Sequence, residues 1–230
     1  PYRQRRDQRA VFRNLDQRQD ILWWAAQSCF PVIDDNRSFE QGRVVHQQFK
    51  PFLALVGAGI FLVSCMPVPI PFTGTCSHPC GTGLAAILIG PLPAVVLASI
   101  ALTLQALFLA HGGLTTLGAN VVTMGVAGAY FGYGVFYLTR RAGLPAVWAA
   151  FFAGAFSDWA TYSATSLVLA EALHMNTPLL PMAGTIMLAF APTQIPLGIL
   201  EGIMSFIAFR FINLRIPELL KAGSLCRKIS

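Results

Sequence analysis

The chain has 230 residues, of which 55% are hydrophobic and 11% are charged, and its formal net charge is +6. Soluble domains carry roughly a quarter of charged residues, so this composition excludes an ordinary soluble domain. No Asp, Glu, Lys or Arg occurs from Pro51 to Thr139, as expected in bilayer hydrocarbon, where an ionised side chain is costly. Of the 16 Lys and Arg residues, nine precede Pro51 and five follow residue 200. This distribution describes the ends of a membrane protein and not a nucleic-acid surface.

The first 48 residues are an atypical polar segment. Pro1–Asp20 is rich in Arg and Gln, which is typical of disordered or weakly helical chain. Ile21–Ile33 is too short to span a bilayer, and the pattern of a signal peptide is absent. Because the chain begins with Pro1 and not Met, we interpret residues 1–48 as an incomplete first helix or an incorrect gene start.

Residues 49–213 contain the predicted membrane bundle, in which each span needs about 20 apolar residues. The stretches that meet or approach this length are Phe52–Val68, Pro91–Ala110, Gly118–Leu138, Pro145–Leu173 and Met182–Ile212. His78–Gly90 would reach only about 18–20 Å as a helix, which predicts a short or re-entrant helix packed inside protein. With a basic tail at 214–230, the sequence predicts an all-α, polytopic membrane helix bundle of about six to seven helices.

The basic flanks predict the orientation, because cytoplasmic loops collect Lys and Arg. Lys50 precedes the first clear span, Arg140 and Arg141 follow Gly118–Leu138, and residues 214–230 are basic. All three clusters are cytoplasmic if the Phe52–Val68 span runs from the inside to the outside and the short helix His78–Gly90 leads the chain back inward. This arrangement places the C-terminus in the cytoplasm, with His78 near the external face of the membrane.

His78 lies in a polar string, residues 75–83, at the expected start of the short helix. Unpaired backbone N–H groups at a helix start carry partial positive charge, which disfavours imidazolium and keeps a neutral nitrogen available for a divalent metal ion. Ser77 is a candidate cap for this helix. The alternative is a structural histidine that caps or bridges helices. We favour metal binding because intramembrane ionisable residues usually serve function.

Two further groups of candidate ligands have competing interpretations. Cys76 and Cys80 flank His78, and their thiolates would suit copper(I) or zinc. They could equally form a local disulfide, but we favour two small apolar residues. His111 opens a Gly-Gly break and Asn120 begins the next predicted helix. A loop turn with a helix cap is as well supported there as a ligand role.

Two acids, Asp158 and Glu201, lie within predicted spans, where such residues usually face the bundle interior and are hydrogen-bonded. For Asp158 we favour a structural polar contact. Glu201 follows two prolines and is expected to lie away from the polar strings, so a structural contact and a role in coupling binding to movement are equally supported. Gln194 is a further structural or coupling candidate. Gly128–Gly132 is a close-packing pattern and a weak signal for partner docking.

The sequence lacks the motifs of several common enzyme classes. It has no phosphate-binding Gly-Lys-Ser/Thr loop, no Gly-x-Ser-x-Gly turn and no His-Glu-x-x-His pair. We therefore predict a protein without enzymatic activity or cofactor. If ATP drives transport, another chain must hydrolyse it.

Two long strings carry a resemblance to a known family. They are centred on Thr-Gly-Thr-Cys-Ser-His-Pro-Cys-Gly-Thr-Gly at residues 73–83 and on His-Gly-Gly-Leu-Thr-Thr-Leu-Gly-Ala-Asn at residues 111–120. Over about residues 49–220 the chain resembles the CbiM/NikM family, the substrate-binding (S) components of energy-coupling-factor (ECF) transporters for cobalt and nickel. The resemblance implies about seven helices and Ni²⁺ or Co²⁺ as the transported ion. It also implies a CbiQ/NikQ-type transmembrane partner, a CbiO/NikO-type ATPase and a CbiN/NikN-type small subunit.

The resemblance also implies roles for individual residues. His78 corresponds to the motif histidine that ligates the metal, while Ser77 and the His111–Asn120 segment with Thr116 would contact the ligands or cover the site. In the family, a Met-His pair at the start of the first helix supplies the other nitrogens, and four nitrogens in a plane suit nickel(II) and, less well, cobalt(II). This chain has no Met-His pair, so as written it lacks most of that ligand set.

Two other functions compete with metal uptake. The missing Met-His pair motivates a structural or regulatory membrane subunit that does not bind metal. A secondary transporter of a small organic solute would use His78, Asn120 and Glu201 as polar contacts. All of these functions require a multi-pass protein in the lipid bilayer.

Overall fold

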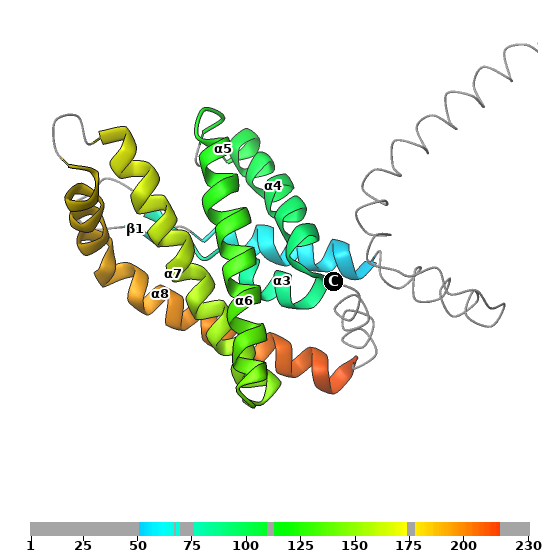
Figure 1. The fold of residues 1–230 in the computed structure, drawn as a ribbon. Helices are drawn as coiled ribbons and strands as arrows, with labels where there is room; N and C mark the ends of the chain where they lie inside the picture. Colours follow the sequence, from blue (N-terminus) through cyan, green and yellow to red (C-terminus); the bar gives the residue numbers. More distant parts are fainter. Residues whose placement is uncertain (1–50, 67, 70–75, 110–112, 174–177, 217–230) are drawn as a thin grey trace, which may run out of the picture.

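A computed structural model describes residues 51–66, 68–69, 76–109, 113–173 and 178–216. Residues 1–48, with their predicted incomplete helix, and most of the basic tail lie outside the described residues. The elements are a helix Pro51–Ser64, β1 Val68–Pro69, β2 Cys76–Ser77, α3 Thr82–Ile89, α4 Pro91–Phe108, α5 Leu117–Asn120, a π-helical stretch η1 Val121–Ala127, α6 Gly128–Arg141, α7 Ala146–Leu173 and α8 Leu179–Arg215. The predicted all-α bundle is confirmed (Figure 1).

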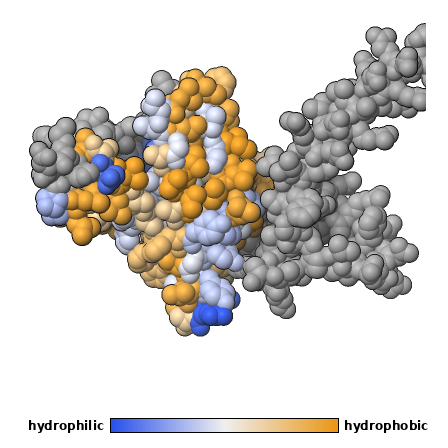
Figure 2. Space-filling model, turned by 45° about the horizontal axis from the view of Figure 1, so that its top comes forward, coloured by the Kyte–Doolittle hydropathy of each residue, from blue (hydrophilic) through white to orange (hydrophobic). Residues whose placement is uncertain are grey.

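Three of the described helical stretches have the length and composition of membrane spans. Pro91–Phe108, the continuous stretch Leu117–Arg141 and Leu179–Arg215 are each long and apolar enough to cross a bilayer. α7, with 28 residues, is also long enough but is not apolar enough to count among these three stretches. Figure 2 shows hydrophobic residues over most of the described surface in that view. A surface of this kind is stable only when lipid or protein covers it.

α3 lies at the centre of the bundle. All of its eight residues except Leu84 are buried, and it packs against α4, α6 and α7. This confirms the prediction of a short helix packed inside protein. The predicted start at His78 is wrong, because Gly81 takes a left-handed conformation (φ 65°) and the helix begins only at Thr82. Gly90, also at positive φ, then turns the chain directly into α4, whose first residue is Pro91.

Small residues let the central helices approach closely. A Cβ atom on Gly132 would lie 2.9 Å from the Cα of Gly83 and 3.0 Å from the Cβ of Ser157, and one on Gly154 would lie 2.8 Å from the Cβ of Ser205. Gly128 likewise faces Thr82 and residues of α7. The Gly128–Gly132 pattern therefore packs inside the chain, and its interpretation as a partner-docking surface is wrong.

α8 is a single helix of 37 residues with Pro192 and Pro196 in its interior. Each proline removes a backbone donor and crowds the preceding turn, which bends a helix. In Figure 1 the gold first part of α8 and its orange last part run in different directions. The predicted span Met182–Ile212 lies wholly within this helix. The bend lets α8 follow α7, against which it packs extensively.

A pair of glycines on α6 tests this packing. Gly132→Ala should destabilise the protein by about 1–3 kcal/mol, because the new methyl group meets the backbone of Gly83 and the side chain of Ser157. Gly134→Ala is the matched control, since nothing lies within 4 Å of a Cβ placed there. The control should be neutral or slightly stabilising, because alanine favours helix by about 0.5–1 kcal/mol. Thermal unfolding of both variants in detergent checks this, and equal melting temperatures would contradict the packing described here.

Candidate functional site

A cavity of about 370 Å³ lies between the segment that precedes α3, the helical stretch α5–η1, α7 and α8. Polar side chains from all four parts reach it. Those that the sequence analysis had singled out are Ser77, His78, Cys80, Thr116, Asn120, Asp158 and Gln194. The fold therefore brings the described parts of both polar strings to one place, as the predicted topology required.

The segment Ser77–Gly81, which carries His78, is held by α8. The Nε2 of Gln194 donates a hydrogen bond to the Oγ of Ser77. The backbone N–H groups of Cys80 and Gly81 donate to the two carboxylate oxygens of Glu201, at 3.1 Å and 2.8 Å. Glu201 therefore lies against the first polar string, and the expectation that it lies away from the strings is wrong.

The contact of Glu201 with Cys80 and Gly81 takes the place of the cap that the sequence predicted from Ser77. The N-cap residue of α3 is Gly81, which has no side chain to cap with, and Ser77 bonds to Gln194 instead. The backbone donors before and at the start of a helix need acceptors, and the positive end of the helix dipole favours a negative charge. Glu201, which is 1% exposed, meets both requirements from 120 residues away.

His78 is partly buried and lines the cavity. Because it precedes Thr82 by four residues, it is not part of the first turn of α3. The helix dipole is therefore a weaker reason for a neutral imidazole than the sequence suggested. Its position in a cavity with other polar side chains is the stronger reason to consider it a ligand.

Asp158 is the one formally charged residue among those that line the described cavity. The residue is only 2% exposed, and its Oδ2 has no hydrogen-bond partner among the described residues. The sequence favoured a structural polar contact for Asp158, but this oxygen has none. No Lys or Arg lines the cavity, so the described walls offer no positive side chain to compensate the carboxylate.

Of the other predicted ligands His111, Cys76 and Cys80, the structure describes the side chain of Cys80. His111 lies outside the described residues, and the side chain of Cys76 does too. Cys80 is buried and its thiol is free, so it forms no local disulfide. Burial raises the pKa of this loop thiol, and the nearby carboxylates of Glu201 and Asp158 raise it further. A protonated thiol fits the favoured interpretation of a small apolar residue better than a thiolate ligand.

Sequence reasoning missed one face of α7. Asp158, Thr161, Tyr162 and Thr165 all line the cavity, and their spacing places them on successive turns of one helix face. The phenol of Tyr162 also donates a hydrogen bond to the carbonyl oxygen of Met187 on α8. A helical period of polar residues within an apolar span was the signal that could have identified this face.

The described residues supply only part of a metal-binding site. No group of three or more His, Cys, Asp and Glu side chains that could hold a metal ion occurs among them. His78 and Asp158 are the strongest donors that line the cavity, with hydroxyl and amide oxygens around them. Any complete ligand set would need donors from outside the described residues or from water.

The bundle and its cavity define a polytopic membrane protein with an internal, partly polar cavity. The family described as "Cobalt uptake substrate-specific transmembrane region", CbiM, matches residues 17–219, and this chain belongs to it. A cobalt transport protein CbiM of Sorangium cellulosum is 55% identical over 172 residues, which are 75% of this chain and 76% of that protein. One from Geobacter sulfurreducens is 50% identical over 200 residues, 86% of this chain but only 57% of that longer protein.

Solved structures agree with this assignment. A crystal structure described as a transition metal transporter has a TM-score of 0.63 with 26% sequence identity, over 73% of this chain and 77% of that one. A truncated transition metal transporter has the same TM-score with 29% identity, over 74% of this chain and 85% of that one. The protein is therefore a membrane transport protein.

Proposed function

We propose that this protein is the substrate-binding membrane subunit of an importer for divalent cobalt or nickel. Its membership of the CbiM family supports this, together with relatives that are named cobalt transport proteins. The single observation that carries the proposal is the cavity in which His78 and the uncompensated carboxylate of Asp158 both face the interior. Imidazole nitrogen is a good ligand for either ion.

The charge of the cavity favours a cation over an anion or a neutral solute. A carboxylate away from water is stable only when it is paired or neutralised, and no Lys or Arg among the lining residues does this for Asp158. A divalent cation in the cavity would compensate it. With a neutral organic solute, the competing substrate class, Asp158 would have to be neutralised by a proton instead. The nitrogen donors that the family resemblance implies would come from outside the described residues.

Energy for uptake would come from partner chains. The sequence has no phosphate-binding Gly-Lys-Ser/Thr loop, so we assign ATP hydrolysis to a CbiO/NikO-type ATPase. A CbiQ/NikQ-type transmembrane subunit would connect that ATPase to this chain, with a CbiN/NikN-type small subunit as an accessory. The exposed apolar helix faces offer surfaces for lipid and for such membrane partners.

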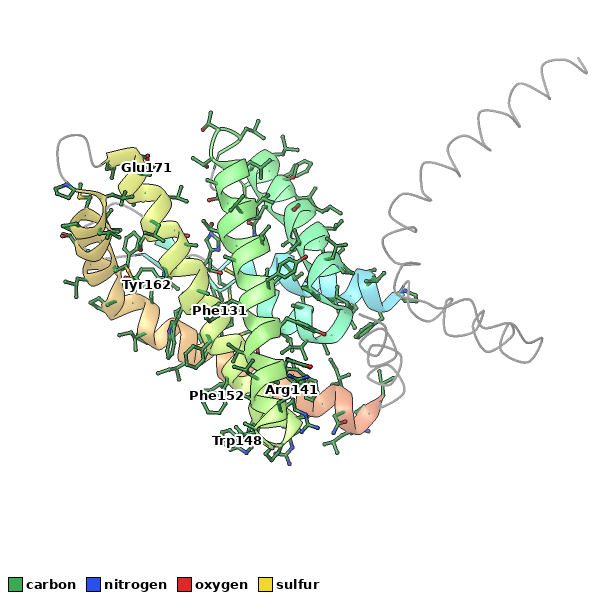
Figure 3. All side chains as sticks on the ribbon, in the orientation of Figure 1. Phe131, Arg141, Trp148, Phe152, Tyr162 and Glu171 are labelled. Atoms are coloured by element: carbon green, nitrogen blue, oxygen red, sulfur yellow. The ribbon has the colours of Figure 1, made fainter. Side chains whose placement is uncertain are left out.

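The cavity lies toward the end of the bundle away from the basic residues. Figure 3 shows Arg141 and Trp148 at one end and Glu171 at the other. Arg141 lies 4.4 Å over the ring of Tyr137, and aromatic and basic residues of this kind mark a cytoplasmic membrane interface. Thr165 and Ala172 line the cavity, and both belong to the second half of α7, which leads to the Glu171 end of the bundle. We therefore place the cavity toward the external face and the C-terminus in the cytoplasm.

A reporter fusion tests this orientation. Green fluorescent protein fused to the C-terminus should fluoresce in cells, because it folds in the cytoplasm. Alkaline phosphatase at the same position should be inactive, because it needs the external compartment to form its disulfides. The opposite pattern would place the cavity on the cytoplasmic side and would contradict an import role for it.

His78 is the residue on which metal binding should depend most. The complete protein, purified in detergent, should bind one Ni²⁺ or Co²⁺ per chain. His78→Ala should weaken this binding by more than roughly 100-fold, since residues that merely orient a ligand already contribute about 10- to 100-fold. Isothermal titration calorimetry measures both values. Unchanged affinity in the variant would remove His78 from the site, and a wild-type protein that binds neither ion would favour the structural or regulatory subunit instead.

Asp158 should contribute through its charge. Asp158→Asn keeps the size of the side chain but removes the negative charge, so affinity for the divalent ion should fall by roughly 10-fold or more. Thr165→Val is the matched control, because Thr165 also lines the cavity and its hydroxyl already bonds to the carbonyl of Thr161 within α7. Equal affinities of the Asn variant and the wild type would show that the cavity selects its ion without Asp158.

A further inference from the structure

Two side chains of α8, Gln194 and Glu201, contact the chain on either side of His78. Gln194 bonds to the side chain of Ser77, one residue before His78, and Glu201 bonds to the backbone of Cys80 and Gly81, two and three residues after it. We call Gln194 and Glu201 the α8 pair. They are seven residues apart, about two helical turns or 10.5 Å, and therefore lie on one face of α8.

The α8 pair makes buried contacts, of which those of Glu201 involve a carboxylate. Glu201 uses both carboxylate oxygens, and hydrogen bonds to a carboxylate are roughly twice as strong as those between neutral groups. Glu201 is 1% exposed and Gln194 is 7% exposed, so water competes little for these bonds. Leaving either side chain without its partner would cost the full desolvation penalty of a buried polar group. The segment Ser77–Gly81 is therefore tied to α8 in its position.

The part of α8 that carries the pair is itself fixed against α7. The indole Nε1 of Trp159 donates a hydrogen bond of 3.2 Å to the backbone carbonyl of Gln194. Gly198, which lies between the pair, packs so closely on the Trp159 ring that any Cβ there would overlap it. Pro192 and Pro196 bend the helix just before and within this stretch. A shift of this part of α8 would therefore carry Ser77–Gly81 with it.

We infer that the α8 pair positions His78 for metal binding and transmits movements of α8 to the metal. The inference rests on the proposed function, because it concerns the same site. Neither Gln194 nor Glu201 needs to touch the ion. They act through Ser77 and through the backbone of Cys80 and Gly81, which set the direction in which the imidazole of His78 points. Groups that orient a ligand in this way typically change metal affinity by about 10- to 100-fold.

Glu201→Gln tests the inference because an amide cannot replace the carboxylate here. The amide oxygen accepts one of the two backbone N–H groups, and its NH₂ group then faces the other donor. Ni²⁺ and Co²⁺ affinity should fall by about 10-fold or more, and the visible absorption bands of the bound ion should shift because His78 is reoriented. Glu201→Asp keeps two acceptor oxygens and should retain more affinity than the Gln variant. Glu171→Gln, the same change at an exposed residue on α7, is the control and should match the wild type.

Gln194→Met is a second, independent variant, in case the Gln variant at position 201 fails to fold. It keeps the length of the side chain and removes only the bond to Ser77, so it should also weaken binding and shift the spectrum. A lower melting temperature with wild-type affinity and an unshifted spectrum in both variants would overturn the inference and make the α8 pair purely structural. If His78→Ala still abolished binding in that case, the proposed function would stand. A wild-type protein that binds neither ion would overturn both.

Discussion

The carboxylate of Glu201 at the start of α3 is the contact on which the rest of the site depends. α3 is a short helix buried in the centre of the bundle, so the unpaired N–H groups at its start need acceptors from the protein. Its N-cap is a glycine, which offers no side-chain acceptor. The carboxylate provides two acceptors and a negative charge at the positive end of the helix dipole. One interaction thereby stabilises both a buried charge and a buried helix terminus.

This contact explains why the cavity has its shape. Because Glu201 joins α8 to Cys80 and Gly81, the segment with His78 forms one wall of the cavity. The opposite walls come from α7 and from α5 and η1, with Thr116 at the N-cap of α5 and Asn120 at its end. Glycines let the helices approach closely elsewhere in the bundle: Gly132 of α6 lies against α3 and α7, and Gly154 of α7 lies against α8. The polar groups thus lie at one end of the bundle and the small residues pack its middle.

The two buried acids differ in a way that fits a transport site. Glu201 is satisfied by backbone donors and needs no ion to be stable. Asp158 has a buried oxygen without a partner among the described residues and faces the cavity. Under the proposed function, Glu201 would hold the wall of the cavity while Asp158 would respond to the cation.

The sequence by itself determined the elements and the family. The absence of charge from Pro51 to Thr139 indicated a membrane protein, and the lengths of the apolar stretches predicted the helices α4, α6, α7 and α8 and the short buried α3. The predicted span Phe52–Val68 is wrong in its length, because the helix there ends at Ser64 and Val68 lies in β1. The strings around His78 and Asn120 predicted the CbiM family, which the comparison confirmed. These features are local, since hydrophobic period, apolar length and motif spacing can all be counted along the chain.

Only the tertiary structure decided how the polar residues are paired. Ser77 was expected to cap α3, but Glu201 accepts the backbone donors there and Ser77 bonds to Gln194. Asp158 was expected to have a structural partner, but its Oδ2 has none among the described residues, and the residue lines the cavity. Gly128–Gly132 was considered for partner docking, and it packs against α3 and α7. Each of these outcomes depends on contacts between residues far apart in the chain, and no local pattern encodes which distant donor or surface will lie opposite.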